Sequence, residues 1–322
     1  MQGGEAFAGR GLRGGCAAFC VALFSGIAVF LSACSGVDED VSAARAKASS
    51  AANREGRADS WTLSQRRLLD IVALQNDLFA DPNADSLDGG ALAEAALRTK
   101  AMRIDSLWKT YFLDFPDDSD ALIIYGKFLR RIGRRDSAYD AFKRAAALAP
   151  DAAVAYQQMS ALEAESGMSA EAFAHIRAAL KIEPDNEVYL RQTAYILVLA
   201  KNELVGRGLS TREFDALLSR CYRRIFEKNP ADKDAKLRYA QSFYDLFEPD
   251  YARALALWRE IRRDSALNID RQTASANIAR VLVELNRDAE AEAVLREVDL
   301  PQLMRAKKLL LSEIERAKNV SK

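Results

Sequence analysis

The chain contains little of the chemistry on which most enzyme sites depend. Among its 322 residues there is one histidine, His175, and beyond position 34 there is one cysteine, Cys221. Neither a GxSxG nor an HExxH motif occurs. A single histidine without a cysteine nearby does not make a metal site, and a lone histidine on a helix is more often solvated or partly packed than catalytic. We therefore expect no catalytic residue, no metal and no cofactor, and a buried structural thiol at Cys221.

The chain also has no net charge and no long run in which apolar and polar residues alternate. Forty-six Lys and Arg residues balance 46 Asp and Glu residues, so no overall positive field favours nucleic acid, and we expect no such partner. Past Trp61 the apolar residues recur at intervals of three and four, as in RRLLDIVALQNDLF. No run rich in Val, Ile and Thr alternates with a period of two. The body is therefore predicted to be all-α.

One long uncharged run lies near the N-terminus. Residues 16–33 carry no charge, follow Arg10 and Arg13, and end in small residues before Cys34. This is the pattern of a secretory signal peptide. The run of 18 residues is also just long enough to cross a bilayer as an uncleaved anchor, which is the alternative interpretation.

The end of this run resembles the bacterial lipobox, in which the cysteine is acylated and becomes the first residue after cleavage: Leu31, Ser32, Ala33 and Cys34. The resemblance implies a lipoprotein signal peptide over 1–33 and lipidation of Cys34, which would attach the protein to a membrane. Ser35 stands where many lipoproteins of the inner membrane carry Asp, which favours the outer membrane, facing the periplasm. Residues 34–59 have no aromatic side chain and are expected to form a flexible tether.

Short proline-containing signals divide the body. FPDD, APDA, EPDN and NPAD place prolines at 116, 150, 184 and 230, and the first two intervals are 34 residues each. Two helices and a closing proline in such a period resemble the tetratricopeptide repeat. The unit over 119–150 fills every signature class of that repeat, with small residues at Gly126, Ala138 and Ala145, a turn glycine at Gly133, and large residues at Tyr125, Leu129 and Phe142.

The resemblance implies an all-α, right-handed α-solenoid of about five to six helix pairs with a C-terminal capping helix. A leading degenerate pair is expected over 60–118 and a capping helix over 299–322. The repeats would cover 119–298, as 119–150, 153–184, 187–230 with an insertion at 201–211, 233–264 and 272–298. Small residues would let the paired helices approach closely, and Gly133, Gly167 and Asn286 would leave the first helices with φ above zero.

In this family the first helices line a concave peptide-binding surface. Carried over by repeat position, the expected contacts are Lys127, Arg130, Arg131, Gln157, Arg191 and Tyr195. The surface would be basic at one end and apolar at the other, which suits a peptide with an acidic end and apolar anchors. The arginines are equally well explained as a solvated helix end that favours the helix dipole.

The resemblance therefore implies a membrane-anchored scaffold that binds envelope proteins or peptides during bacterial envelope assembly or secretion. Outer-membrane barrel assembly, pilus biogenesis and polysaccharide export are examples of such work. The alternative is an envelope enzyme, or a regulatory subunit of a cell-wall enzyme, with its site in the 201–211 insertion or the leading helices.

Overall fold

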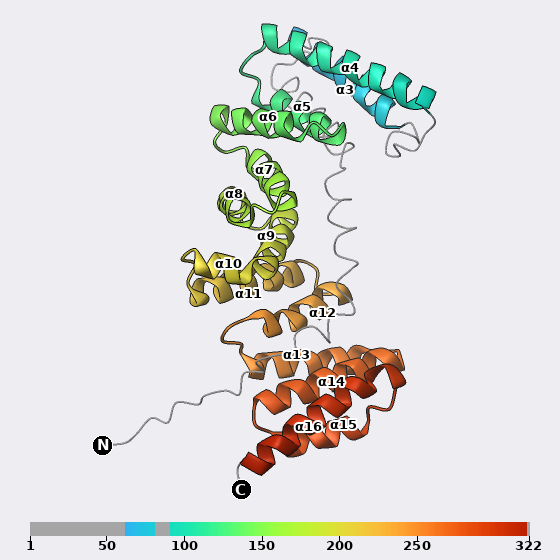
Figure 1. The fold of residues 1–322 in the computed structure, drawn as a ribbon, viewed down its shortest axis with the longest axis vertical. Coiled ribbons are helices and arrows are strands. Elements are labelled where there is room, and N and C mark those ends of the chain that lie inside the picture. Colours follow the sequence, from blue (N-terminus) through green and yellow to red (C-terminus); the bar gives the residue numbers. More distant parts are fainter. Residues whose placement is uncertain (1–61, 81–90, 321–322) are drawn as a thin grey trace, which may run out of the picture. The chain divides into compact units, whose positions relative to one another are not determined.

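A computed structural model of the protein describes residues 62–80 and 91–320 (Figure 1). Within these two ranges every regular element is a helix, as the apolar spacing predicts. In chain order the elements are α3 (Leu63–Phe79), α4 (Ala91–Asp114), α5 (Ser119–Arg131), α6 (Arg135–Leu148), α7 (Ala153–Glu165), α8 (Ser169–Ile182), α9 (Glu187–Leu199), α10 (Lys201–Gly206), α11 (Thr211–Lys228), α12 (Lys233–Ser242), the 3₁₀ turn η1 (Phe243–Asp245), α13 (Tyr251–Asp264), α14 (Asn268–Glu284), α15 (Asp288–Arg296), η2 (Pro301–Leu303) and α16 (Met304–Val320).

The described residues fall into two compact units, one that ends at Ile196 and one that begins at Leu197. In the first unit α3 packs on α4, α5 on α6, α6 on α7 and α7 on α8. Its core includes Trp108, Phe128 and Phe142. In the second unit α11 packs on α12, α13 on α14 and α14 on α15, and α16 contacts both α14 and α15. The core there includes Trp258 and Leu282.

The small repeat positions are where the two helices of a pair approach each other closely. A Cβ atom built on Gly126 of α5 would lie 2.5 Å from Cε1 of Phe142 on α6, which is well inside van der Waals contact. Ala138 and Ala145 of α6 have no exposed surface. The ring of Phe142 therefore fills the space that any side chain larger than hydrogen would need at position 126.

The turns between paired helices use the backbone conformation that the sequence predicts. Gly133 has φ 80°, Gly167 has φ 77° and Asn286 has φ 58°, in the left-handed region that glycine and then asparagine tolerate best. In each turn an N–H just past this residue donates to a carbonyl five residues earlier, as from Arg134 to Leu129 at 2.8 Å and from Arg287 to Leu282 at 2.9 Å. These bonds satisfy carbonyls at the end of the first helix.

The 201–211 insertion forms part of the packed structure of the second unit. It contains α10, a turn at Gly208 with φ 107°, and the start of α11, where the Ser210 and Glu213 side chains each bond the other residue's backbone N–H. The ammonium group of Lys201 lies 3.9 Å from the centroid of the Phe247 ring, and it donates a hydrogen bond to the Asp245 carbonyl. The cation of Lys201 is thus held inside the fold by an aromatic face.

Candidate functional site

The basic side chains expected at one end of the peptide surface lie on α5. The guanidinium of Arg130 donates to Gln158 at 2.9 Å and forms an ion pair with Glu165, both on α7. Arg131 lies over the Phe79 ring of α3, 4.1 Å from its centroid, and Lys127 is half-buried. Arg130 and Arg131 therefore both contact neighbouring helices, and Glu165 offsets part of the charge of Arg130.

Gln157 on α7 occupies a different environment from the one expected of a peptide contact. It is 4% exposed and takes part in a chain of side-chain hydrogen bonds. Arg130 donates to Gln158, Gln158 to Gln157 at 2.8 Å, Gln157 to Gln192 of α9 at 2.8 Å, and Gln192 to Ser160 Oγ at 2.9 Å. Each amide thus has a donor and an acceptor partner, which buried amides need. This series of hydrogen bonds joins α5, α7 and α9.

The expected contacts on α9 form a stripe. Val188, Arg191 and Tyr195 are spaced by three and four residues, so they share one face of the helix. Val188 is 42% exposed and Tyr195 is 39% exposed. Arg191 forms an ion pair with Glu187 one turn earlier, at 2.6 Å. This face of α9 therefore offers apolar surface on both sides of an arginine.

The lone histidine belongs to a buried polar cluster. His175 Nδ1 of α8 lies 2.7 Å from Glu163 Oε2 on α7, and the Tyr139 hydroxyl of α6 donates to Glu163 Oε1 at 2.8 Å. Glu163 is 2% exposed, and the Tyr156 ring stacks against the His175 ring. Sequence reasoning missed this cluster, although Glu163 stands where the repeat pattern requires a large apolar residue.

The cysteine in the described part of the chain is also enclosed. Cys221 of α11 is buried, as expected, and burial raises the pKa of its thiol to about 12. Such a thiol is protonated at neutral pH and a poor nucleophile. Among residues 62–80 and 91–320 no group of three or more His, Cys, Asp or Glu side chains could hold a metal ion.

The predicted lipidation site, Cys34, lies outside the described residues, as do the signal peptide and the tether up to residue 59. None of the helices in the described ranges is long and apolar enough to cross a membrane.

Comparisons with known proteins give the fold. No protein-family model matches the chain, and no curated protein matches it by sequence. Among solved structures, a chain of the Naa15/Naa10 complex bound to HypK-THB is similar in fold, with a TM-score of 0.56 and 13% sequence identity. The match covers 80% of the present chain and 35% of the Naa15/Naa10 chain. The chain thus spans about a third of that protein.

Two shorter proteins match over nearly their whole length. YrrB, described as a tetratricopeptide-repeat protein with an unusual peptide-binding site, matches 62% of this chain and 97% of its own, with a TM-score of 0.48 and 18% identity. PilF of Pseudomonas aeruginosa matches 80% of this chain and 99% of its own, with a TM-score of 0.43 and 11% identity. In the described residues the helices pack in pairs and positive-φ residues stand at the turns, as in tetratricopeptide-repeat solenoids.

Proposed function

We propose that the protein is a lipid-anchored scaffold of the bacterial envelope that binds a peptide segment of another envelope protein along α5, α7 and α9. Its work would be envelope assembly or secretion, of the kind served by barrel-assembly, pilus or polysaccharide-export adaptors. The observation that carries the proposal is the stripe of Val188, Arg191 and Tyr195 on α9, where two large apolar side chains are left exposed.

The stripe has the dimensions of a peptide-binding surface. Val188 and Tyr195 are seven residues apart, so their Cα atoms are separated by roughly 10 Å along the helix axis. That separation suits apolar side chains three residues apart in a peptide with polyproline II conformation, where such side chains share one face about 9 Å apart. Tyr195 adds a partly exposed aromatic ring, and aromatic residues often dominate binding energy. The cations Lys127 and Arg131 on α5 favour an acidic end for the same peptide.

Photocrosslinking in the native envelope tests the choice of surface. A photoreactive residue is placed singly at Lys127, Arg131 and Tyr195, and control positions on the second helices are the exposed Lys143 of α6 and Arg177 of α8. We expect one specific envelope protein to be captured from the three first-helix positions. Capture of a specific protein from Lys143 or Arg177 alone would show that the proposed surface is the wrong one.

The variant Tyr195→Ala should then weaken binding of the captured partner about tenfold or more, because it removes an exposed aromatic anchor without touching the core. Met168→Ala is the matched control, since Met168 is 45% exposed and lies next to α8. Isothermal titration calorimetry with the purified partner gives both dissociation constants. Equal effects of the two substitutions would contradict a specific role for α9.

A further inference from the structure

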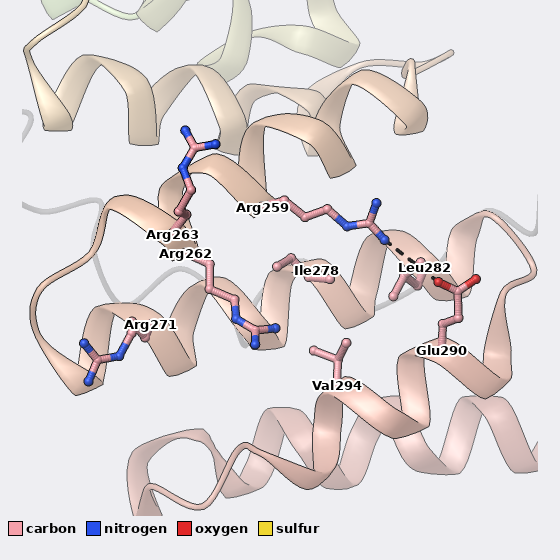
Figure 2. Close-up of a pocket in the computed structure, with 8 residues that line it drawn as sticks. All are labelled: Arg259, Arg262, Arg263, Arg271, Ile278, Leu282, Glu290 and Val294. Atoms are coloured by element: carbon pink, nitrogen blue, oxygen red, sulfur yellow. Dashed lines mark ion pairs between the residues drawn. The ribbon is translucent and has the colours of Figure 1, made fainter.

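The second unit contains a hollow that the peptide surface does not use. It has a volume of about 470 Å³ and lies over α14, between the second helices α13 and α15 (Figure 2). Its floor is apolar, made of the buried Ile278 and Leu282 of α14 and the half-buried Val294 of α15. Its rim is basic and includes Arg259 and Arg262 of α13 and Arg271 of α14.

The one carboxylate that lines this hollow has another, better partner. Glu290 of α15 lies 3.9 Å from Arg259, whereas Arg287 donates to its two oxygens at 2.6 and 2.7 Å. A bidentate pair of this kind is the stronger interaction, so Glu290 contributes little to neutralising Arg259. The side chain of Arg259 is 53% exposed and therefore remains accessible to a ligand.

The other arginines are positioned by contacts at the rim. Arg262 pairs with Glu297 at 2.8 Å, and its guanidinium points toward Val294 (Figure 2). Arg271 donates to the Ala266 carbonyl at 2.8 Å, just after the end of α13. The dipole of α13 accounts for a cation in its last turn, as at Arg262. It does not account for Arg259, more than a turn from that end, or for Arg271 on the next helix.

We propose that this hollow binds an acidic linear segment of a partner protein, with an aliphatic side chain of the segment on Ile278 and Val294 and its carboxylates on Arg259 and Arg262. The guanidinium fork matches a carboxylate in a bidentate geometry, and arginine loses little solvation when it does so. The apolar floor takes up a side chain that a purely electrostatic contact would leave in water. The volume lies within the range of pockets that bind small ligands. This site is formed by α13, α14 and α15 and not by the helices of the first-helix surface, so it gives the protein a second point of attachment.

A peptide array tests the proposal with the full-length protein. The array holds nine-residue peptides in which one aliphatic or aromatic residue is flanked by three to five Asp and Glu residues, each beside an analogue with Asn and Gln. Hits are titrated by fluorescence anisotropy against the wild type and the Arg259→Gln/Arg262→Gln variant. The control is Arg305→Gln, an exposed arginine of α16 in the same unit. Circular dichroism verifies that both variants fold.

We expect acidic peptides to bind, their neutral analogues not to bind, and the double variant to weaken binding at least tenfold while Arg305→Gln leaves it within twofold. The proposal is overturned if no acidic peptide binds, if the analogues bind equally well, or if the double variant binds like the wild type. Vesicles containing phosphatidylglycerol form a separate arm. Loss of vesicle binding in the double variant, without any peptide binding, would instead identify the rim as a contact for anionic lipid.

Discussion

At the scale of single residues, the carboxyl of Glu284 shows how burial sets charge in this fold. Glu284 lies at the end of α14 and is 7% exposed. Burial is the largest effect and raises the pKa of its carboxyl; nearby Arg280 lowers that pKa, and Glu313 of α16 raises it. Burial likewise raises the pKa of Glu313. The folded protein thus favours the neutral form of Glu284 more than the unfolded chain does.

We predict that Glu284→Gln stabilises the protein at pH 7. A raised folded-state pKa means that the contribution of this carboxyl to stability is present below its unfolded pKa, near 4.5, and is lost as pH rises through the folded value. Glutamine keeps the shape and removes the charge. Thermal unfolding followed by circular dichroism should show a higher Tm for the variant at pH 7 and no difference at pH 4. A lower Tm at pH 7 would contradict this account.

The environments of Gln157 and Glu163 could not be predicted from the repeat pattern. The pattern states which face of a helix a residue occupies, but the burial of a polar side chain depends on the neighbouring pair. Gln157 can be buried because its amide donates a hydrogen bond to Gln192 of α9. Glu163 can be buried because its carboxylate contacts Tyr139 and His175. The one sequence signal was at position 163, where a glutamate stands in place of the apolar residue that the repeat pattern requires.

At the scale of elements, the pairing of α5 with α6 depends on a position that has no side chain. We predict that Gly126→Val destabilises the protein by about 1–3 kcal/mol, because the added atoms would overlap the Phe142 ring. Gly206→Ala is the control, since a Cβ at Gly206 of α10 meets no atom within 4 Å. Urea unfolding gives both free energies. The account fails if the two variants are equally stable.

The element boundaries show what the sequence could and could not predict. Prolines and turn residues predict the pairs α5–α6 and α7–α8, because each constrains the backbone directly. The helix α10 was not expected, since it lies in an insertion outside the 34-residue period. Likewise α14 spans Asn268–Glu284, and the repeat period does not state how far a helix extends.

At the scale of the whole molecule, attachment to a membrane depends on a residue outside the described ranges. We predict that Cys34→Ala abolishes lipid attachment and that the precursor then keeps its signal peptide. Globomycin, which blocks lipoprotein signal peptidase, should likewise leave an uncleaved precursor of the wild type. Metabolic labelling with palmitate and fractionation of the host envelope are the measurements. Unchanged processing and labelling of the variant would favour the uncleaved anchor instead.

The division into two units was not predictable. It falls between Ile196 and Leu197, inside α9, where the sequence EVYLRQTAYILVL contains neither proline nor glycine. Local sequence signals mark where helices end, whereas the grouping of helices into units depends on contacts between residues far apart in the chain.

The hydrogen-bonded glutamines also limit how this sequence can change. Because Gln157 donates to Gln192 and accepts from Gln158, the loss of one amide leaves its neighbours with buried groups that no longer have partners. Replacing Gln157 and Gln192 together by apolar residues removes the part of that penalty that arises between these two amides. In descendants of this gene the two positions should therefore change as a pair, even though they lie in successive repeats and are 35 residues apart.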